Sequence, residues 1–171
     1  ITYRLTANLS VEANWALESG LADLAAAAWH APYLELAGID TDLLPPVRRP
    51  AELAGYLTAD AARETGLPEG LPVVVGCADH VASAFAAGLV DEGDLNIKFG
   101  GAGDILFCLE RLDTDPRLYI DYHLAPGKYL INGCMAAGGS LVRWFGQNFG
   151  DRMGGVAERP EQLDAAAAGL E

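Results

Sequence analysis

The chain has 171 residues, 51% hydrophobic and 20% charged, so it can bury a core and is too apolar to be disordered. Its formal charge of −13 excludes a nucleic-acid or anionic-membrane partner, because both need clustered lysine and arginine. An acidic protein can still bind phosphate locally, through backbone N–H groups and Mg²⁺.

The cysteines are Cys77, Cys108 and Cys134, an odd number without the CxxC spacing of zinc sites. The sequence therefore predicts buried free thiols in a reducing cytoplasm, with neither a disulfide framework nor a metal site. No apolar run approaches the ~20 residues of a membrane span, and no signal peptide is visible. The chain opens without Met and closes directly after DAAAAG, so we expect it to be a piece of a longer protein.

The first part of the chain predicts short helices separated by turns. Residues 1–9 allow a strand or an entry loop, and residues 10–20 predict a helix capped by its serine. A second helix is predicted over residues 21–29, where apolar residues recur at 3–4 spacing. A third is expected over residues 32–38, with proline in its first turn and glycine at its end.

A linker and a capped helix come next. Residues 40–50 contain three prolines, which prevent regular backbone hydrogen bonding. Thr58 is placed to cap a helix that ends at Gly66. The turn-rich segment GLPEGL, residues 66–71, is the predicted domain boundary. The tryptophans at positions 15 and 29 are expected to fill the core.

Residues 71–103 are the stretch on which the functional prediction depends. They predict a buried strand over residues 73–75, a turn carrying Asp79 and His80, and a helix of small residues. An alternating strand over residues 95–99 then runs into a glycine turn. Proteins of the α/β class place ligands and chemistry where a carboxylate at a strand end lies beside such a turn.

The remainder of the chain predicts antiparallel pairing followed by helices. The first strand pair is expected over residues 95–99 and 104–110, and the second over residues 119–124 and 128–135. The second pair is joined by Pro and Gly in the order of a type II turn. A helix begins after Ser140, with Trp144 expected in the core, and a last helix is predicted over residues 161–168.

Asp79 has two readings from local sequence, and both stay open. Aspartate is favoured as a helix N-cap, where its carboxylate accepts a backbone N–H. It also suits a general base that takes a proton from a substrate hydroxyl. The two roles are compatible only if one carboxylate oxygen stays free. His80 is equally suited to donate a hydrogen bond to a substrate or to be a satisfied, half-buried imidazole.

Two glycine clusters are candidates for phosphate binding. Gly100, Gly101 and Gly103 remove side chains at a strand–strand turn, which lets backbone N–H groups approach an anion. Gly138 and Gly139 precede a helix, whose N-terminus offers free N–H donors and a partial positive charge. Each cluster alone is equally typical of a tight turn. One carboxylate together with both clusters favours a functional site.

The sequence resembles the FGGY carbohydrate kinases, the group of xylulokinase, glycerol kinase and ribulokinase. The likeness is carried by LPPVRRPAELAGYLTADAARETGLPEGLPVVVGCADH, by the helix and glycine turn after it, and by MAAGGSLVRWF. It implies an α/β, actin-like (ribonuclease H-like) ATPase-domain fold whose two lobes close over substrate. Residues 1–66 would end the first, sugar-binding lobe, and residues 71–171 would begin the second, nucleotide-binding lobe.

The resemblance also implies a reaction. In that family the aspartate of the G-x-x-D turn, here Asp79, deprotonates the sugar hydroxyl that attacks ATP, and the next residue, here His80, often contacts sugar. We therefore expect ATP-dependent phosphorylation of a small ketose, pentulose or polyol, with ATP and Mg²⁺ as cofactors. No nucleic-acid or membrane partner is expected, and a homodimer is allowed. The alternative is a non-catalytic nucleotide- or sugar-binding module that kept the fold.

The family places both glycine clusters at the nucleotide. The positions that the resemblance assigns to the nucleotide are Gly100, Gly101, Gly103, Gly138, Gly139 and Arg143. Backbone N–H groups of Gly101 and Gly139 are expected to line the phosphates. Gly101-Ala102 replaces the family's G-T-S or G-T-G form, so a hydroxyl able to bond phosphate is missing. The family's N-terminal Asp-x-Gly-Thr motif also has no counterpart, and we expect these 171 residues alone to have little or no kinase activity.

Overall fold

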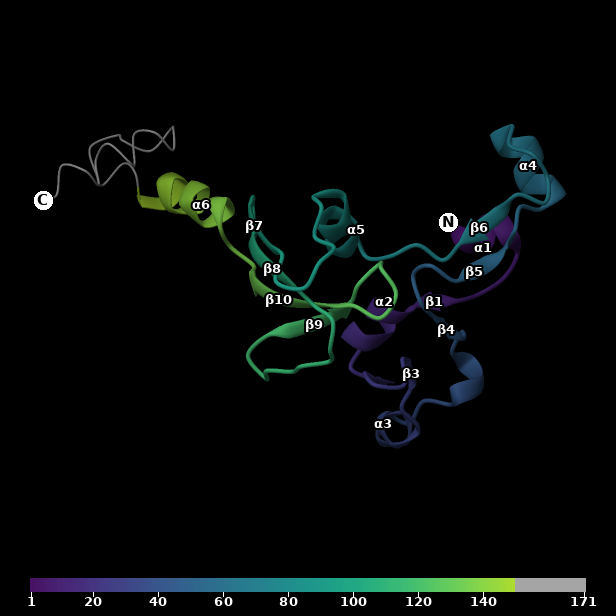
Figure 1. Cartoon of the computed structure of the whole chain (residues 1–171), viewed down its shortest axis with the longest axis horizontal. Coiled ribbons are helices and arrows are strands. Elements are labelled where there is room, and N and C mark those ends of the chain that lie inside the picture. The colour runs from purple at the N-terminus through teal and green to yellow at the C-terminus, as the bar shows by residue number, and fades with distance from the viewer. Residues whose placement is uncertain (150–171) are drawn as a thin grey trace, which may run out of the picture.

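A computed structural model describes residues 1–149 (Figure 1). The helix predicted over residues 161–168 lies outside the described residues. The helices are α1 (Thr2–Thr6), α2 (Ala13–Glu18), α3 (Ala31–Ala37), α4 (Ala59–Thr65), α5 (Asp79–Ala86) and α6 (Gly139–Phe149), with a 3₁₀ turn at Thr41–Leu43. Within residues 1–149 no helix has both the length and the apolar character to cross a membrane.

Short strands pair in the first part of the chain and longer ones in the second. The strands are β1 (Val11–Glu12), β2 (Ala22–Asp23), β3 (Ala28–Trp29), β4 (Val47–Arg48), β5 (Leu53–Tyr56), β6 (Pro72–Val74), β7 (Leu95–Phe99), β8 (Gly103–Leu109), β9 (Tyr119–Tyr122) and β10 (Tyr129–Met135). Strands β7–β10 form an antiparallel sheet in the order β7-β8-β10-β9. Figure 1 shows α1, α4, β5 and β6 gathered at one end of the molecule and α6 beyond that sheet at the other.

The predicted helix over residues 21–29 is wrong, because β2 and β3 form a hairpin there. The Asp23 carboxylate accepts the N–H of Ala26, and Ala27 has a φ of 50°. A side chain that bonds its own turn competes with the helix, and a left-handed residue ends it. The strand or loop expected over residues 1–9 is also wrong, since α1 forms there.

Helix-end chemistry in the sequence is confirmed at two helices. The hydroxyl of Thr58 accepts the N–H of Ala61 and caps α4, which ends at the left-handed Gly66 (φ 75°). Helix α3 carries proline in its first turn and ends at Gly38, whose φ is 69°. Both glycines adopt the conformation that disfavours any residue with a Cβ. The two strand pairs predicted for the second half are confirmed as well.

Several predicted core residues are exposed. Strand β6 pairs with β5 at the surface, and Val74 is 58% exposed, so the buried strand predicted there is wrong. Trp15 and Trp144 are also half exposed, and Cys134 is an exposed thiol. Trp29 is half-buried, with its indole N–H donating to the carbonyl of Pro45. Apolar composition predicted burial at these positions, whereas the neighbouring elements leave their side chains uncovered.

The main core lies between α5 and the four-stranded sheet. Buried side chains of α5, of the residues around it and of β8 and β10 form one cluster: Ala78, Val81, Ala84, Leu89, Leu106, Cys108 and Leu130. The small residues of α5 allow the helix to lie close to the sheet. This packing places the N-terminus of α5, with Asp79 and His80, at the edge of the sheet.

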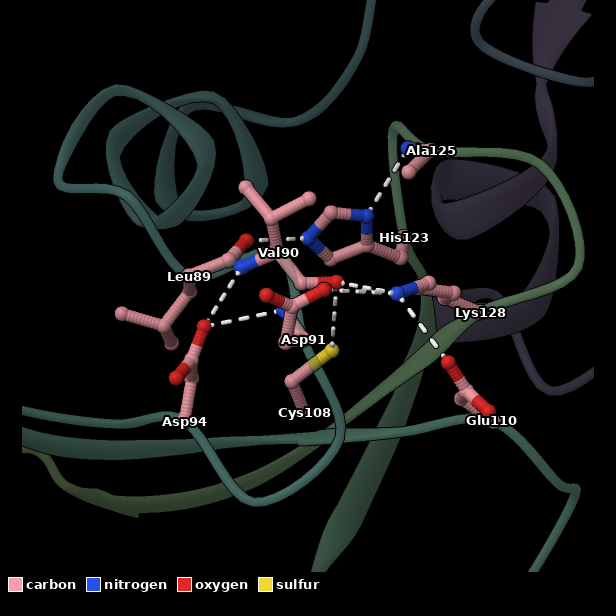
Figure 2. A network of polar contacts seen from close by, with 9 residues as sticks. All are labelled: Leu89, Val90, Asp91, Asp94, Cys108, Glu110, His123, Ala125 and Lys128. Carbon is pink, nitrogen blue, oxygen red and sulfur yellow. Dashed lines mark hydrogen bonds and ion pairs between the residues drawn. The ribbon is translucent and has the colours of Figure 1, made fainter.

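A polar network holds the segment after α5 against the β9–β10 hairpin (Figure 2). The imidazole of His123 is buried: its Nε2 lies 2.8 Å from the Leu89 carbonyl, and its Nδ1 accepts the N–H of Ala125. The ammonium of Lys128 donates to the carbonyl of Val90 and lies 3.2 Å from Glu110. These contacts anchor the residues that directly follow α5.

Asparagine and tyrosine side chains join the first segment of the chain to the edge of this sheet. The fully buried Asn14 of α2 bonds both the N–H and the carbonyl of Tyr122 in β9. The Tyr122 hydroxyl donates to the carbonyl of Leu24, and the guanidinium of Arg49 lies 4.7 Å from its ring centroid. Residues on both sides of the predicted 66–71 boundary also pair as β5 and β6. The boundary itself stays a prediction.

Candidate active site

A pocket of about 700 Å³ opens where the end of α2, the start of α5 and the sheet meet. Its lining residues are Leu17, Glu18, Asp79, His80, Lys98, Asp104, Leu118, Tyr119, Ile120, Asp121, Asn132 and Cys134. Pockets of this volume accept a small organic ligand. Both residues predicted for catalysis and sugar contact therefore lie at one cavity.

Asp79 is the first residue of α5, and Ala78 is the N-cap, so the N-cap reading of Asp79 is wrong. One position inside the helix, its carboxylate makes no capping hydrogen bond, and its side chain is 98% exposed. The nearest charged partner is Nδ1 of His80, 3.6 Å from Oδ1. The helix therefore holds neither oxygen, and the carboxylate can accept a hydrogen bond from a ligand.

His80 faces carboxylates on both sides, and its side chain is 17% exposed. Its Nε2 lies 3.2 Å from Oδ2 of Asp121, a buried side chain of β9 that is 4% exposed. Neither atom has a partner in hydrogen-bonding geometry among residues 1–149, so the contact is an ion pair. The polar contact with Asp121 raises the pKa of His80, against the opposing effect of burial.

The sheet contributes a second group of polar side chains. Lys98, Asp104 and Cys134 lie on adjacent strands in register, and the Lys98 ammonium is 3.3 Å from Oδ2 of Asp104. The neighbouring thiol of Cys134 and then Lys98 lower the pKa of the Asp104 carboxyl. Asn132 lies two residues before Cys134 on β10 and points to the same face by the two-residue period. A carboxylate, an ammonium and an amide can together orient the hydroxyl groups of a polar ligand.

Sequence reasoning missed these sheet residues and Asp121. A signal was present in the pattern, because single polar residues interrupt apolar strands at Asp104, Asp121 and Asn132. Strand register decides which of them share a face, and register follows from pairing that local sequence leaves open. Glu18 gave no signal, because a charged residue near a helix end is usually solvated.

The two glycine clusters meet each other, and none of their glycines lines the pocket of Asp79. The N–H of Gly138 donates to the carbonyl of Gly101 (2.7 Å), and the N–H of Gly139 donates to that of Gly100 (2.9 Å). A Cβ at Gly139 would lie 2.9 Å from the Gly100 oxygen, and one at Gly138 would lie 3.1 Å from the carbonyl carbon of Ala102. Glycine is therefore required by the close approach of two backbone segments. We call this contact the glycine junction.

Hydrogen bonding at the glycine junction corrects one expectation. The N–H of Gly139 is occupied by the protein's own carbonyl, so the expectation that this group lines phosphates is wrong. Gly101 and Ala102 keep backbone N–H groups without a backbone acceptor inside the described range. Gly103 pairs within the sheet, and Arg143 is exposed on α6. Nucleotide contact at the predicted glycines and at Arg143 stays a prediction.

Comparisons with known proteins agree on one family. The model of the FGGY family of carbohydrate kinases, N-terminal domain, matches residues 1–86. The structure superposes on xylulose kinase from Rhodospirillum rubrum with a TM-score of 0.84 and 47% identity, covering 100% of this chain and 35% of that one. Autoinducer-2 kinase from Yersinia enterocolitica is 33% identical over 147 residues, which is 85% of this chain and 28% of that protein.

A more distant structure shows the same fold. Glycerol kinase from Plasmodium falciparum, solved with ADP, has a TM-score of 0.74 at 16% identity and covers 94% of this chain. The chain spans about a third of the length of these relatives. Its α/β architecture is thus part of the actin-like fold that the resemblance implied. On these matches, the chain belongs to the FGGY family of carbohydrate kinases.

Proposed function

We propose that this chain is the central part of an ATP-dependent carbohydrate kinase in which Asp79 is the general base. The observation that carries the proposal is the free carboxylate of Asp79 at a polar pocket of about 700 Å³. Asp79 takes the proton from a substrate hydroxyl as that oxygen attacks the terminal phosphate. A base positioned in this way contributes roughly 10²–10⁴-fold to the rate.

The pocket chemistry supports a small polyhydroxylated substrate. Asp104 and Lys98 offer an acceptor and a donor on one wall, and Asn132 offers both on a neighbouring strand. His80 lines the same cavity, and its Nδ1 edge beside Asp79 suits a contact with a second hydroxyl. The 47% identity with a xylulose kinase makes a pentulose the first substrate to test.

The phosphate side of the site is assigned to the glycine junction. MgATP supplies the phosphoryl group, and the free N–H groups of Gly101 and Ala102 suit contact with its phosphate oxygens. The hydroxyl of Ser140 donates to the carbonyl of Gly101 and so orients that turn rather than the phosphate. Backbone donors thus take the place of the hydroxyl that the G-T-S form supplies.

A chimera tests the proposal, because this chain is shorter than its relatives. The segment replaces the matching 35% of the R. rubrum xylulose kinase, over which the two chains superpose with a TM-score of 0.84. ADP release is measured with MgATP and a panel of pentuloses, glycerol and polyols. We expect turnover with at least one of them. Sugar or ADP binding by calorimetry without ADP release, from a folded chimera, would instead support the non-catalytic binding module.

A further inference from the structure

His80 and Asp121 form a buried ion pair whose two facing atoms make no hydrogen bond to any other group among residues 1–149. Asp121 Oδ2 and His80 Nε2 are each shielded from solvent, and neither has a hydrogen-bond partner within residues 1–149. Asn14, by contrast, is fully buried and hydrogen-bonds to both backbone groups of Tyr122, whereas Glu12, His30 and Asn132 each keep one buried polar atom unpaired within residues 1–149. A buried polar atom without a hydrogen-bond partner destabilises a protein. Binding of an ion or another ligand to that atom would remove the cost.

Glu18 completes a cluster around this pair. It lies at the end of α2, and one ligand atom each from Glu18, His80 and Asp121 lie within 4.8 Å of one another. Three elements distant in sequence therefore converge on one point, at the wall of the pocket described above. Glu18 is exposed, so this side of the cluster is open to entering ions.

We propose that Glu18, His80 and Asp121 bind a divalent transition-metal cation, of the class of Zn²⁺ or Mn²⁺. Carboxylate oxygens and imidazole nitrogens bind such ions at about 2.0–2.2 Å, which places adjacent ligands roughly 3–3.5 Å apart. The 3.2 Å between Nε2 of His80 and Oδ2 of Asp121 fits this separation. Glu18 offers a carboxylate oxygen within 4.8 Å of a ligand atom of each of these residues.

The charge of the three side chains and the types of their ligand atoms limit which ions the site can bind. Two carboxylates and a neutral imidazole carry a net charge of −2, which a divalent cation balances. Imidazole suits zinc and similar ions, and the two carboxylates also suit Mn²⁺, whereas Mg²⁺ prefers an all-oxygen ligand set and retains its waters. The glycine junction, to which the proposed function assigns phosphates of MgATP, does not line this pocket. Remaining coordination positions face the pocket and can take water or a substrate hydroxyl.

The test uses this chain with metal alone, so its result does not depend on the proposed kinase reaction. Zn²⁺ and Mn²⁺ are titrated separately by calorimetry into EDTA-treated, desalted protein. We expect one site per chain, weakened at least about tenfold in Glu18→Gln and abolished in Asp121→Asn. Glu69→Gln, a change at an exposed glutamate outside the pocket, is the matched control and should bind as the unmodified chain does.

Two further readouts keep the proposal open to refutation. Zn²⁺ should shift the imidazole resonances of His80 and leave those of His30 and His123 in place. Cys134→Ala should retain binding, because the exposed thiol beside Asp104 is a competing zinc ligand. Loss of binding in that variant, equal binding in Glu18→Gln and Glu69→Gln, or no uptake of either ion would overturn the site. Glu18 is exposed, so Glu18→Gln decides the matter even if Asp121→Asn does not fold.

Discussion

Two histidines of this fold, His80 and His123, differ in the groups that surround their imidazole rings. His123 has backbone partners at both ring nitrogens and is 3% exposed, as Figure 2 shows for its bonds to Leu89 and Ala125. Because Nδ1 accepts an N–H, Nε2 is the nitrogen that donates to the Leu89 carbonyl. His80 has carboxylates at both nitrogens and opens onto a pocket. The first imidazole joins two segments of the fold, whereas the second lines the candidate site.

The largest effect on folding is expected at His123. His123→Phe leaves the Leu89 carbonyl and the Ala125 N–H unpaired in the core, at about 1–3 kcal/mol for each group. Urea denaturation of the chain should show this loss of unfolding free energy. His123→Gln, whose amide can accept and donate, should restore part of it. Equal stability of His123→Phe and the unmodified chain would remove the distinction between the two histidines.

The glycine junction is a second region whose backbone groups are hydrogen-bonded to each other. Added bulk at this junction should lower the affinity for ADP. Gly139→Ala puts a methyl group 2.9 Å from the Gly100 oxygen, so the two segments must separate, at about 1–3 kcal/mol. In the chimera we expect ADP affinity to fall by about tenfold, measured by calorimetry. Ser140→Ala removes one hydrogen bond without added bulk and should have a smaller effect. Unchanged ADP affinity in Gly139→Ala would place the nucleotide elsewhere.

The contribution of His80 to stability should depend on pH. Asp121 raises the pKa of His80 above its ordinary value of 6.5, so the native state holds the proton more tightly than the unfolded state. The resulting stabilisation is complete below about pH 6.5 and is lost as pH rises through the native pKa. Asp121→Asn should lower the NMR titration midpoint of His80, measured in EDTA. An identical midpoint in both proteins would contradict the ion pair.

The smallest effect is expected at Lys128, on the solvent side of the network around His123. Lys128→Met removes a donor to the Val90 carbonyl and the ion pairs with Glu110 and Asp91, two largely exposed carboxylates. Exposed ion pairs contribute little and are screened by salt. The denaturation midpoint should fall by less than in His123→Phe, and the difference from the unmodified chain should shrink at high salt. A larger loss than in His123→Phe would reverse the ranking.

The sequence predicted those features of the fold that depend on residues close to one another in the chain. The cap at Thr58, the left-handed ends at Gly38 and Gly66, and the strand pairs of the second half all follow from residue types at fixed spacing. The hairpin at residues 22–29 was missed because the Asp23 carboxylate bonds its own turn and overrides an apolar spacing typical of a helix. Which strands pair, and which side chains are thereby buried, depends on contacts between residues far apart in the sequence.

The same division holds for the site. Asp79 and His80 are adjacent in sequence, and their motif could be recognised. Asp121 and Glu18 reach His80 only through the pairing of β9 with β10 and the docking of α2 on β9, which no local pattern encodes. The contact between the two glycine clusters likewise depends on sheet register, although each cluster was visible alone.

The proposed reaction depends most on the free carboxylate of Asp79, and the turnover of Asp79→Asn in the active chimera tests it most directly. The substitution keeps the side-chain shape and removes the base. We predict that kcat falls by about 10²–10⁴-fold while the affinity for ADP changes little. A kcat within a factor of about two of the unmodified chimera would contradict the assignment of Asp79 as the base.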